Sequence, residues 1–92
     1  MTAIECVLFG QVREDVGERS LAIETDATTI GELLDQMTDR YPALVDHLFD
    51  DGALASDIII TRNQKHVKQL DGTATPIQDG DIIRITLAFY GG

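Results

Sequence analysis

The sequence predicts a two-layer α+β fold, in which one main helix covers one face of a mixed β-sheet. Three observations support this prediction: a regular alternating strand near the end of the chain, one long amphipathic helix in the middle, and short strand-length apolar runs on both sides of that helix. A helix stripe and a sheet face can each bury their apolar side against the other. With 92 residues the chain suffices for one domain with a modest core. We expect that domain to span residues 1–90, followed by a flexible tail at residues 91–92.

Two strands are expected before the helix. Ile4–Phe9 is an apolar run of strand length, and Arg19–Glu24 alternates apolar with polar side chains. In the first strand, Val7 and Phe9 share a face with Glu5, because side chains alternate between the two faces of a sheet. We therefore expect this face to be the one open to solvent.

The main helix is expected to begin after Thr29 and to end before Pro42. Thr29 and Glu32 have the spacing of a capping box, in which two free backbone N–H groups are satisfied at the start of a helix. The residue before a proline is disfavoured in the α conformation, which sets the end. The following segment, Ala43–Phe49, is expected to form a short helical turn at the sheet edge. One apolar stripe runs along the helix: Ile30, Leu33, Leu34, Met37 and Tyr41.

Three strands are expected after the helix. Ile58–Thr61 is β-branched throughout and should be buried on both faces or nearly so. His66–Leu70 is expected to be a short edge strand. Ile83–Phe89 alternates most regularly and should be the last strand.

Turns are expected where polar and glycine residues gather. Gly10–Gly17 is charged and bounded by glycines, so we expect a turn there and no regular element. Asn63 and Gln64 suit a tight turn after the third strand.

The charge of the chain is strongly acidic. Sixteen Asp and Glu residues against seven Lys and Arg give a formal charge of −9, which disfavours binding to nucleic acid. Lysine is scarce and aspartate abundant, and this combination suggests an organism with a salty cytosol, where salt screens the self-repulsion. An unfolding midpoint that does not change between low and molar salt would rule this hypothesis out.

The sequence also indicates a compartment. It contains no apolar run long enough to span a membrane. The N-terminus has no basic region and brings Glu5 into its apolar stretch, so we expect no signal peptide and a cytoplasmic location. Cys6 is the only cysteine and is expected to be a small buried residue rather than a reactive thiol.

Residue patterns of conventional enzymes are missing from the sequence. His47 and His66 do not have the spacing of a metal-binding pair, and we expect both to be ordinary surface histidines. We expect no metal site and no bound cofactor. No glycine-rich phosphate loop opens a helix, and no serine has a base at a catalytic spacing.

The C-terminus carries the most distinctive feature of the sequence. Gly91 and Gly92 end the chain, a pairing expected by chance in roughly 1 of 200 sequences. Glycine lacks a Cβ atom, so an enzyme could thread this tail through a narrow channel and reach the Gly92 carboxylate. A carboxylate is a poor electrophile, and adenylation would make its carbon open to attack by a thiol, a sulfur donor or a lysine amine. A partner must supply the ATP site.

Several segments together resemble the family of molybdopterin-synthase small subunits, ubiquitin-like sulfur carriers and small archaeal modifier proteins. They are Leu8–Glu14, the helix from Thr29 to Tyr41, Asp79–Asp81, and the terminal Gly91-Gly92. The resemblance covers nearly the whole chain, with its segments in the right order. Asn63 also lies where that family often has asparagine.

The resemblance implies a β-grasp (ubiquitin-like) fold with the first and last strands side by side. It further implies that the protein is not an enzyme but the substrate of an E1-like activating enzyme, which uses ATP to form an acyl-adenylate on Gly92. Gly92 then becomes a thiocarboxylate or joins a target lysine in an isopeptide bond. Tyr90 and Gly91 would be read by enzymes that recognise the tail. The leading reading is a modifier of the haloarchaeal type, with sulfur carriage as a second role.

Two alternatives remain open at this stage. The chain could be the sulfur-donating small subunit of a molybdopterin synthase, with its tail in a large subunit, or a non-covalent β-grasp interaction domain. As a modifier it implies target proteins and a desampylating protease as partners. Val7 and Phe9 are candidate docking residues for the activating enzyme, unless Ala43–Phe49 buries them. Lys65 and Lys68 are candidate acceptors of another copy.

Overall fold

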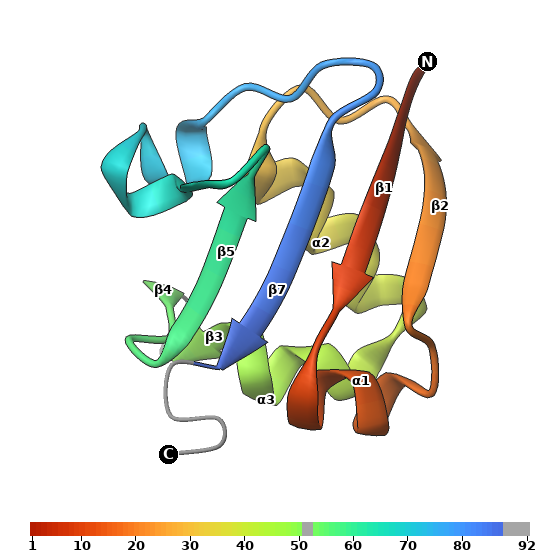
Figure 1. Cartoon of the computed structure of the whole chain (residues 1–92), viewed down its shortest axis with the longest axis vertical. Coiled ribbons are helices and arrows are strands. Elements are labelled where there is room, and N and C mark those ends of the chain that lie inside the picture. Colours follow the sequence, from red (N-terminus) through yellow and green to blue (C-terminus); the bar gives the residue numbers. More distant parts are fainter. Residues whose placement is uncertain (51–52, 88–92) are drawn as a thin grey trace.

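Five strands form one mixed sheet, and the longest helix lies across one of its faces (Figure 1). The computed structural model describes residues 1–50 and 53–87. The strand order in this sheet is β2-β1-β7-β5-β6. The bounds of these strands are Thr2–Leu8 for β1, Ser20–Thr25 for β2, Ile58–Arg62 for β5, Lys65–His66 for β6 and Ile82–Leu87 for β7.

The first and last strands lie side by side in the middle of the sheet, as the resemblance implied. β1 pairs with β7 in parallel, with Val7 opposite Arg84. The other pairings are antiparallel: β1 with β2, β5 with β7 and β5 with β6. The sheet is therefore mixed, and its strand β7 has a partner along both sides.

The main helix, α2 (Ile30–Arg40), has the predicted start and end. The Thr29 hydroxyl accepts a hydrogen bond from the Glu32 N–H at 3.3 Å. The reciprocal bond of the expected capping box is shifted by one residue, because the Glu32 carboxylate accepts from the Thr28 N–H at 2.7 Å. Tyr41 leaves the helical conformation directly before Pro42, as the steric effect of proline predicts.

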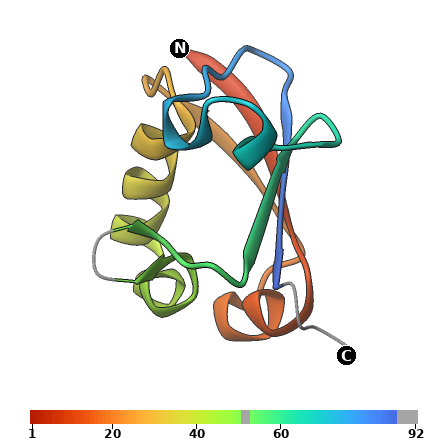
Figure 2. The same cartoon turned by 90° about the vertical axis from the view of Figure 1, so that its left-hand side faces the viewer.

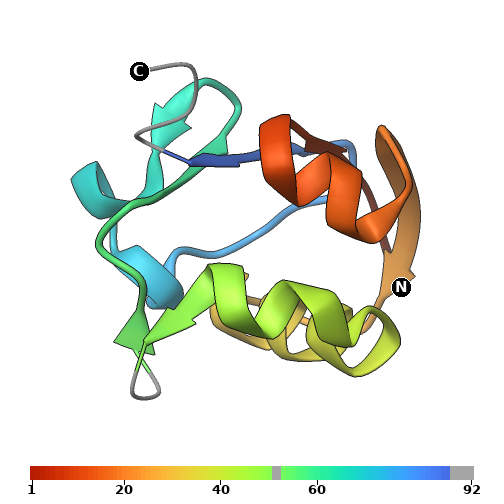
Figure 3. The same cartoon turned by 90° about the horizontal axis from the view of Figure 1, so that it is seen from below.

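Short helical turns follow α2, in agreement with the prediction for residues 43–49. They are the 3-10 turn η1 (Pro42–Leu44) and the helix α3 (Val45–Leu48), which lie with α2 on the same side of the sheet (Figure 3). A small second sheet, which the sequence analysis did not anticipate, pairs β3 (Phe49–Asp50) with β4 (Ala53–Leu54).

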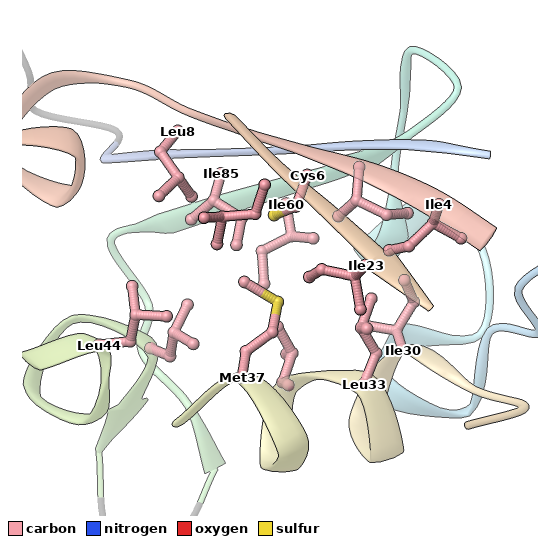
Figure 4. Packing of buried hydrophobic residues seen from close by; sticks show 14 of the residues in the cluster. Ile4, Cys6, Leu8, Ile23, Ile30, Leu33, Met37, Leu44, Ile60 and Ile85 are labelled. Carbon is pink, nitrogen blue, oxygen red and sulfur yellow. The ribbon is translucent and has the colours of Figure 1, made fainter. Parts of the chain in front are cut away.

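The hydrophobic core lies between the sheet and the helical layer (Figure 2). One face of β1, β5 and β7 meets the apolar stripe of α2, and Leu44 and Leu48 close one end. Leu8, Ile60 and Ile85 from three different strands are completely buried. Figure 4 shows these side chains pointing from the sheet toward Met37, Leu33 and Ile30 of the helix.

The turn predicted for residues 10–17 is wrong: this segment is a helix, α1 (Gly10–Val16). Val12 is completely buried and fixes the helix against the domain. Gly17 ends it in the left-handed conformation, with its N–H bonded to the Arg13 carbonyl. The charged side chains that suggested a turn lie on the outer side of this short helix.

Two strand predictions need smaller corrections. The expected edge strand His66–Leu70 is limited to the two residues of β6, and the chain then forms the 3-10 turns η2 (Val67–Gln69) and η3 (Gly72–Ala74). Ile58–Thr61 is not buried on both faces, because Ile59 and Thr61 are half-exposed on the open side of the sheet. The last strand is described as far as Leu87, and Phe89 lies outside the described residues.

Candidate functional site

The described part of the chain ends at Leu87 in β7, a strand with a partner on each side. Leu87, the last described residue of β7, lies opposite Ile58 of β5. On the other side of β7, the Phe9 N–H donates to the Ile85 carbonyl at 3.1 Å. The root of the tail is therefore held from both sides. The predicted recognition residues Tyr90 and Gly91 and the reactive Gly92 lie outside the described residues.

A shallow hollow lies next to the root of the tail. Its lining residues are Phe9, Gly10, Arg13 and Thr86. The Arg13 guanidinium lies 5.5 Å from the centre of the Phe9 ring, and its Nε donates to the Leu8 carbonyl at 2.9 Å. Helix α1, which the sequence analysis took for a turn, thus forms one wall of this hollow. An aromatic ring with a cation above it offers a partner both an apolar and a positively charged contact.

Val7 and Phe9 lie on the open face of the sheet, as predicted. Both are half-buried, and neither belongs to the core cluster or packs against it. The alternative, that residues 43–49 cover them, is wrong, because Leu44 and Leu48 of that segment point into the core on the opposite side of the sheet. Val7 is flanked across the sheet by Arg84 and Ser20.

A buried carboxylate at the other end of β7 was missed by the sequence analysis. Asp81 is 5% exposed and accepts hydrogen bonds from Arg62 Nε and Asn63 Nδ2, each at 2.8 Å. The Asn63 Oδ1 in turn accepts from the Ile82 N–H at 3.0 Å. Asn63 and Gln64 both have positive φ angles, which confirms the predicted tight turn. The sequence signals for this group were Asn63 and Asp79–Asp81, both through the family resemblance.

The candidate acceptor lysines lie far from the root of the tail. Lys65 in β6 and Lys68 in η2 are both exposed. The hairpin that carries Lys65 lies at the end of the domain opposite to the end from which the chain leaves β7 (Figure 1).

The two histidines are partly exposed, in keeping with the expected surface positions, and each has a hydrogen-bond partner. His47 Nε2 lies 2.5 Å from Asp15 Oδ2 and links α3 to α1. Hydrogen bonds from His47 and from Gln11 lower the pKa of Asp15. His66 Nδ1 accepts from the Lys68 N–H at 3.2 Å.

Three further findings bear on the chemistry. Burial raises the pKa of the Cys6 thiol to about 12, in agreement with its expected place in the core. Residues 1–50 and 53–87 hold no cluster of three or more side chains of the kind that bind metals. No helix in the same part of the chain is both long and apolar enough to cross a membrane.

Comparison with known proteins places this domain in a family. The model of the ThiS family matches residues 6–92, which is nearly the whole chain. The chain belongs to the ThiS family. Its match runs through the end of the chain, so it includes the terminal glycine pair.

Two relatives of this ThiS-family protein come from the haloarchaeon Haloferax volcanii. Small archaeal modifier protein 3 is 32% identical over 91 residues, covering 97% of this chain and 98% of its own length. Small archaeal modifier protein 1 is 33% identical over 91 residues, covering 97% of this chain and 100% of its own length. The crystal structure of small archaeal modifier protein 1 from Haloferax volcanii superimposes on this chain with a TM-score of 0.85 at 27% identity. The match covers 98% of this chain and 99% of the crystallised one. The ThiS-family protein therefore has the ubiquitin-like β-grasp fold, and these two relatives are small archaeal modifier proteins.

Proposed function

We propose that this chain is a ubiquitin-like protein modifier that acts through its Gly92 carboxylate. The observation that supports this most directly is the terminal Gly91-Gly92 pair, placed just beyond a strand that is held on both sides, in a chain related over nearly its full length to small archaeal modifier proteins. A rigid root and a short glycine-ended tail allow an enzyme to bind the domain and reach the carboxylate with little rearrangement.

The chemistry proceeds in two steps. A carboxylate oxygen of Gly92 attacks the α-phosphorus of ATP on an E1-like enzyme, giving an acyl-adenylate and pyrophosphate. The ε-amine of a target lysine, or a sulfur donor, then attacks the carbonyl carbon and AMP leaves. The first nucleophile gives an isopeptide bond and the second leads to a thiocarboxylate. The chain itself binds no cofactor in this scheme, and both steps take place in the cytoplasm.

The activating enzyme docks on the open face of the sheet in this proposal. Val7 and Phe9 lie outside the core cluster and stay partly exposed on this face, with the Arg13 guanidinium beside the Phe9 ring. Arg13 and Arg84 border them, so this face presents two positive side chains beside the acidic Glu5, on a protein of net charge −9. Apolar residues on a solvent face often mark a partner site, and the arginines favour an acidic partner surface.

The proposal is tested by removing Gly91 and Gly92 and by extending the chain beyond Gly92. Both variants should fold normally, because terminal residues beyond the last strand of a domain generally contribute little to its core. Neither should form covalent adducts or gain sulfur when incubated with the cell's activating enzyme and ATP, as followed by intact-mass spectrometry. Adducts formed by the shortened chain would contradict the mechanism.

The same experiments separate the modifier from its two alternatives. A small subunit of molybdopterin synthase would gain sulfur but form no isopeptide bonds, and would copurify with one large subunit. A non-covalent interaction domain would release no pyrophosphate from ATP with the activating enzyme. We favour the modifier because both relatives above 30% identity are modifier proteins. Target proteins, a desampylating protease, and Lys65 or Lys68 of a second copy complete the proposed partners.

A further inference from the structure

One edge of the sheet is a long strand without the usual protection. β2 ends the strand order, and Figures 1 and 3 show no segment of residues 1–50 and 53–87 beyond it. Its register with β1 is continuous from Thr2 to Val7, so no bulge twists the edge away. It contains neither proline nor lysine, two residues that commonly block such edges. By contrast, the opposite edge strand, β6, is only two residues long.

Three residues of β2 direct their backbone groups to solvent. The Leu8 N–H donates to the Arg19 carbonyl at 2.8 Å, which fixes that pair as a hydrogen-bonded one. Hydrogen-bonded pairs alternate along an antiparallel ladder, so Leu21 and Ile23 also bond to β1. The N–H and C=O groups of the residues between them therefore point outward: Ser20, Ala22 and Glu24.

Two hollows beside this edge, between β2 and α2, together form a groove that the Gln36 side chain interrupts, because it hydrogen bonds with Thr25 and Asp26. The first hollow is lined by the apolar residues Ile23, Met37 and Tyr41 and by Glu24, Gln36 and Arg40. Gln36 lines this hollow and also the next one along the helix. The second hollow has three carboxylates and no basic residue in its lining, which consists of Asp26, Ala27, Glu32, Asp35 and Gln36.

We propose that an extended segment of a partner protein binds here as an additional strand beside β2. Its backbone pairs with Ala22 and its neighbours, one apolar side chain enters the hollow floored by Met37, and a lysine or arginine further along the same face meets Asp26 and Asp35. Side chains of an added strand point alternately toward and away from the helix, which places both contacts on one side.

The charges argue against a second copy of this chain as the occupant. Two β2 strands paired in antiparallel about Ala22 would bring Asp26 of one copy opposite Glu18 of the other, in two symmetric places. Both residues are exposed acids. Like charges directly opposite each other destabilise a strand pair. A basic segment has the complementary charge.

This surface is distinct from the tail and its docking face. Strand β1 separates the β2 edge from β7, whose last described residue is Leu87 (Figure 1). The two hollows are on the helix side of β2, whereas Val7 and Phe9 lie on the open face of the sheet. A receptor could recognise the domain through the groove, and this inference does not depend on the tail chemistry.

The test uses a short synthetic peptide. In its first part valine and threonine alternate, so that the valines share one side of the extended chain. In the part that follows, lysines take the positions on that same side. Its counterpart has glutamates in place of the lysines. Titrated into 15N-labelled protein, the lysine peptide should shift the amide signals of Ser20–Thr25 and Gln36. It should also slow hydrogen exchange of the Ala22 and Glu24 amides at least several-fold, because their N–H groups acquire partners. The glutamate peptide should bind more weakly.

Two variants sharpen the test. Asp35→Lys should weaken binding of the lysine peptide about fivefold, as expected for reversing one surface charge contact. Asp46→Lys on α3 makes the same charge change away from the groove and should not change the affinity. Ala22→Pro removes an outward N–H without breaking a bond to β1 and should abolish the slowed exchange.

Three results would overturn the proposal. The first is equal binding of the lysine and glutamate peptides. The second is a response confined to the open face around Val7 and Arg84. The third is movement of the β2 signals with protein concentration alone, which would identify a second copy as the occupant.

Discussion

Asn63 and Asp81 are joined by a 2.8 Å hydrogen bond from the Asn63 side-chain amide to a carboxylate oxygen. The bond connects the turn between β5 and β6 with the start of β7. Asp81 accepts two further hydrogen bonds at 2.8 Å, from Arg62 Nε and from the Gln78 N–H. One buried carboxylate thus ties the end of β5 and its following turn to the segment before β7, at the end of the sheet where β7 begins.

We predict that Asp81→Asn destabilises the domain by about 2–3 kcal/mol, because the charged hydrogen bonds are lost and the Arg62 guanidinium is left without its counter-charge. Chemical denaturation measures this change. Asp39→Asn is the matched control, since it removes the same charge from an exposed position of α2. Equal stability of the two variants would mean that the Asp81 group contributes little.

The same carboxylate should make stability depend on pH. Burial raises the pKa of Asp81, but hydrogen bonds from Arg62, Asn63 and Gln78 outweigh it and hold the pKa below its ordinary value. The folded protein therefore takes up this proton at lower pH than the unfolded chain, in which an aspartate has a pKa of about 3.9. The contribution of Asp81 to the free energy of unfolding is fully present above that value and is lost as the pH falls through the folded-state pKa.

Urea unfolding of the natural protein should accordingly show a midpoint that falls steeply below about pH 4. The Asp81→Asn variant should show a shallower fall over the same range. Asp15 and Glu32, whose pKa values are also lowered, remain in both proteins and account for the dependence that is left. Parallel curves for the two proteins would contradict this assignment.

Phe9→Glu should slow adenylation of Gly92 by the activating enzyme, because it places a charge in the proposed docking face. The measurement is pyrophosphate release at varied protein concentration, with a rise in KM as the main effect. Val45→Glu is the control: Val45 is 44% exposed but lies on α3, away from that face. Thermal unfolding of both variants checks that the fold is intact. Unchanged kinetics for Phe9→Glu would reject the docking face.

The modifier function predicts a specific remnant on target lysines. Trypsin cuts after lysine and arginine, and Arg84 is the last such residue, so the remnant should be Ile85–Gly92 rather than diglycine. A protease that cuts after aromatic residues would cut after Tyr90 and leave the diglycine tag. We predict modified lysines on several unrelated proteins when either remnant is sought by mass spectrometry of cell extracts. Detection of the thiocarboxylate alone, with one large partner, would instead support the molybdopterin-synthase alternative.

The sequence by itself determined the elements whose signals are local. The capping residues before Ile30 and the proline after Tyr41 place the ends of α2, and the alternation after Ile82 places β7. It also indicated the open face of β1, because Glu5 cannot be buried without a partner. The terminal glycines need no structure to be noticed.

Only the tertiary structure decided the features that depend on residues distant in sequence. α1 has seven residues, too few for a helix that is stable alone, and burial of Val12 against the domain is what makes it form. The Asp81 group joins residues from two strands and a turn, and no local pattern announces it. The groove beside β2 exists because α2 packs against the sheet next to an edge strand. Long-range packing sets the distance between α2 and β2.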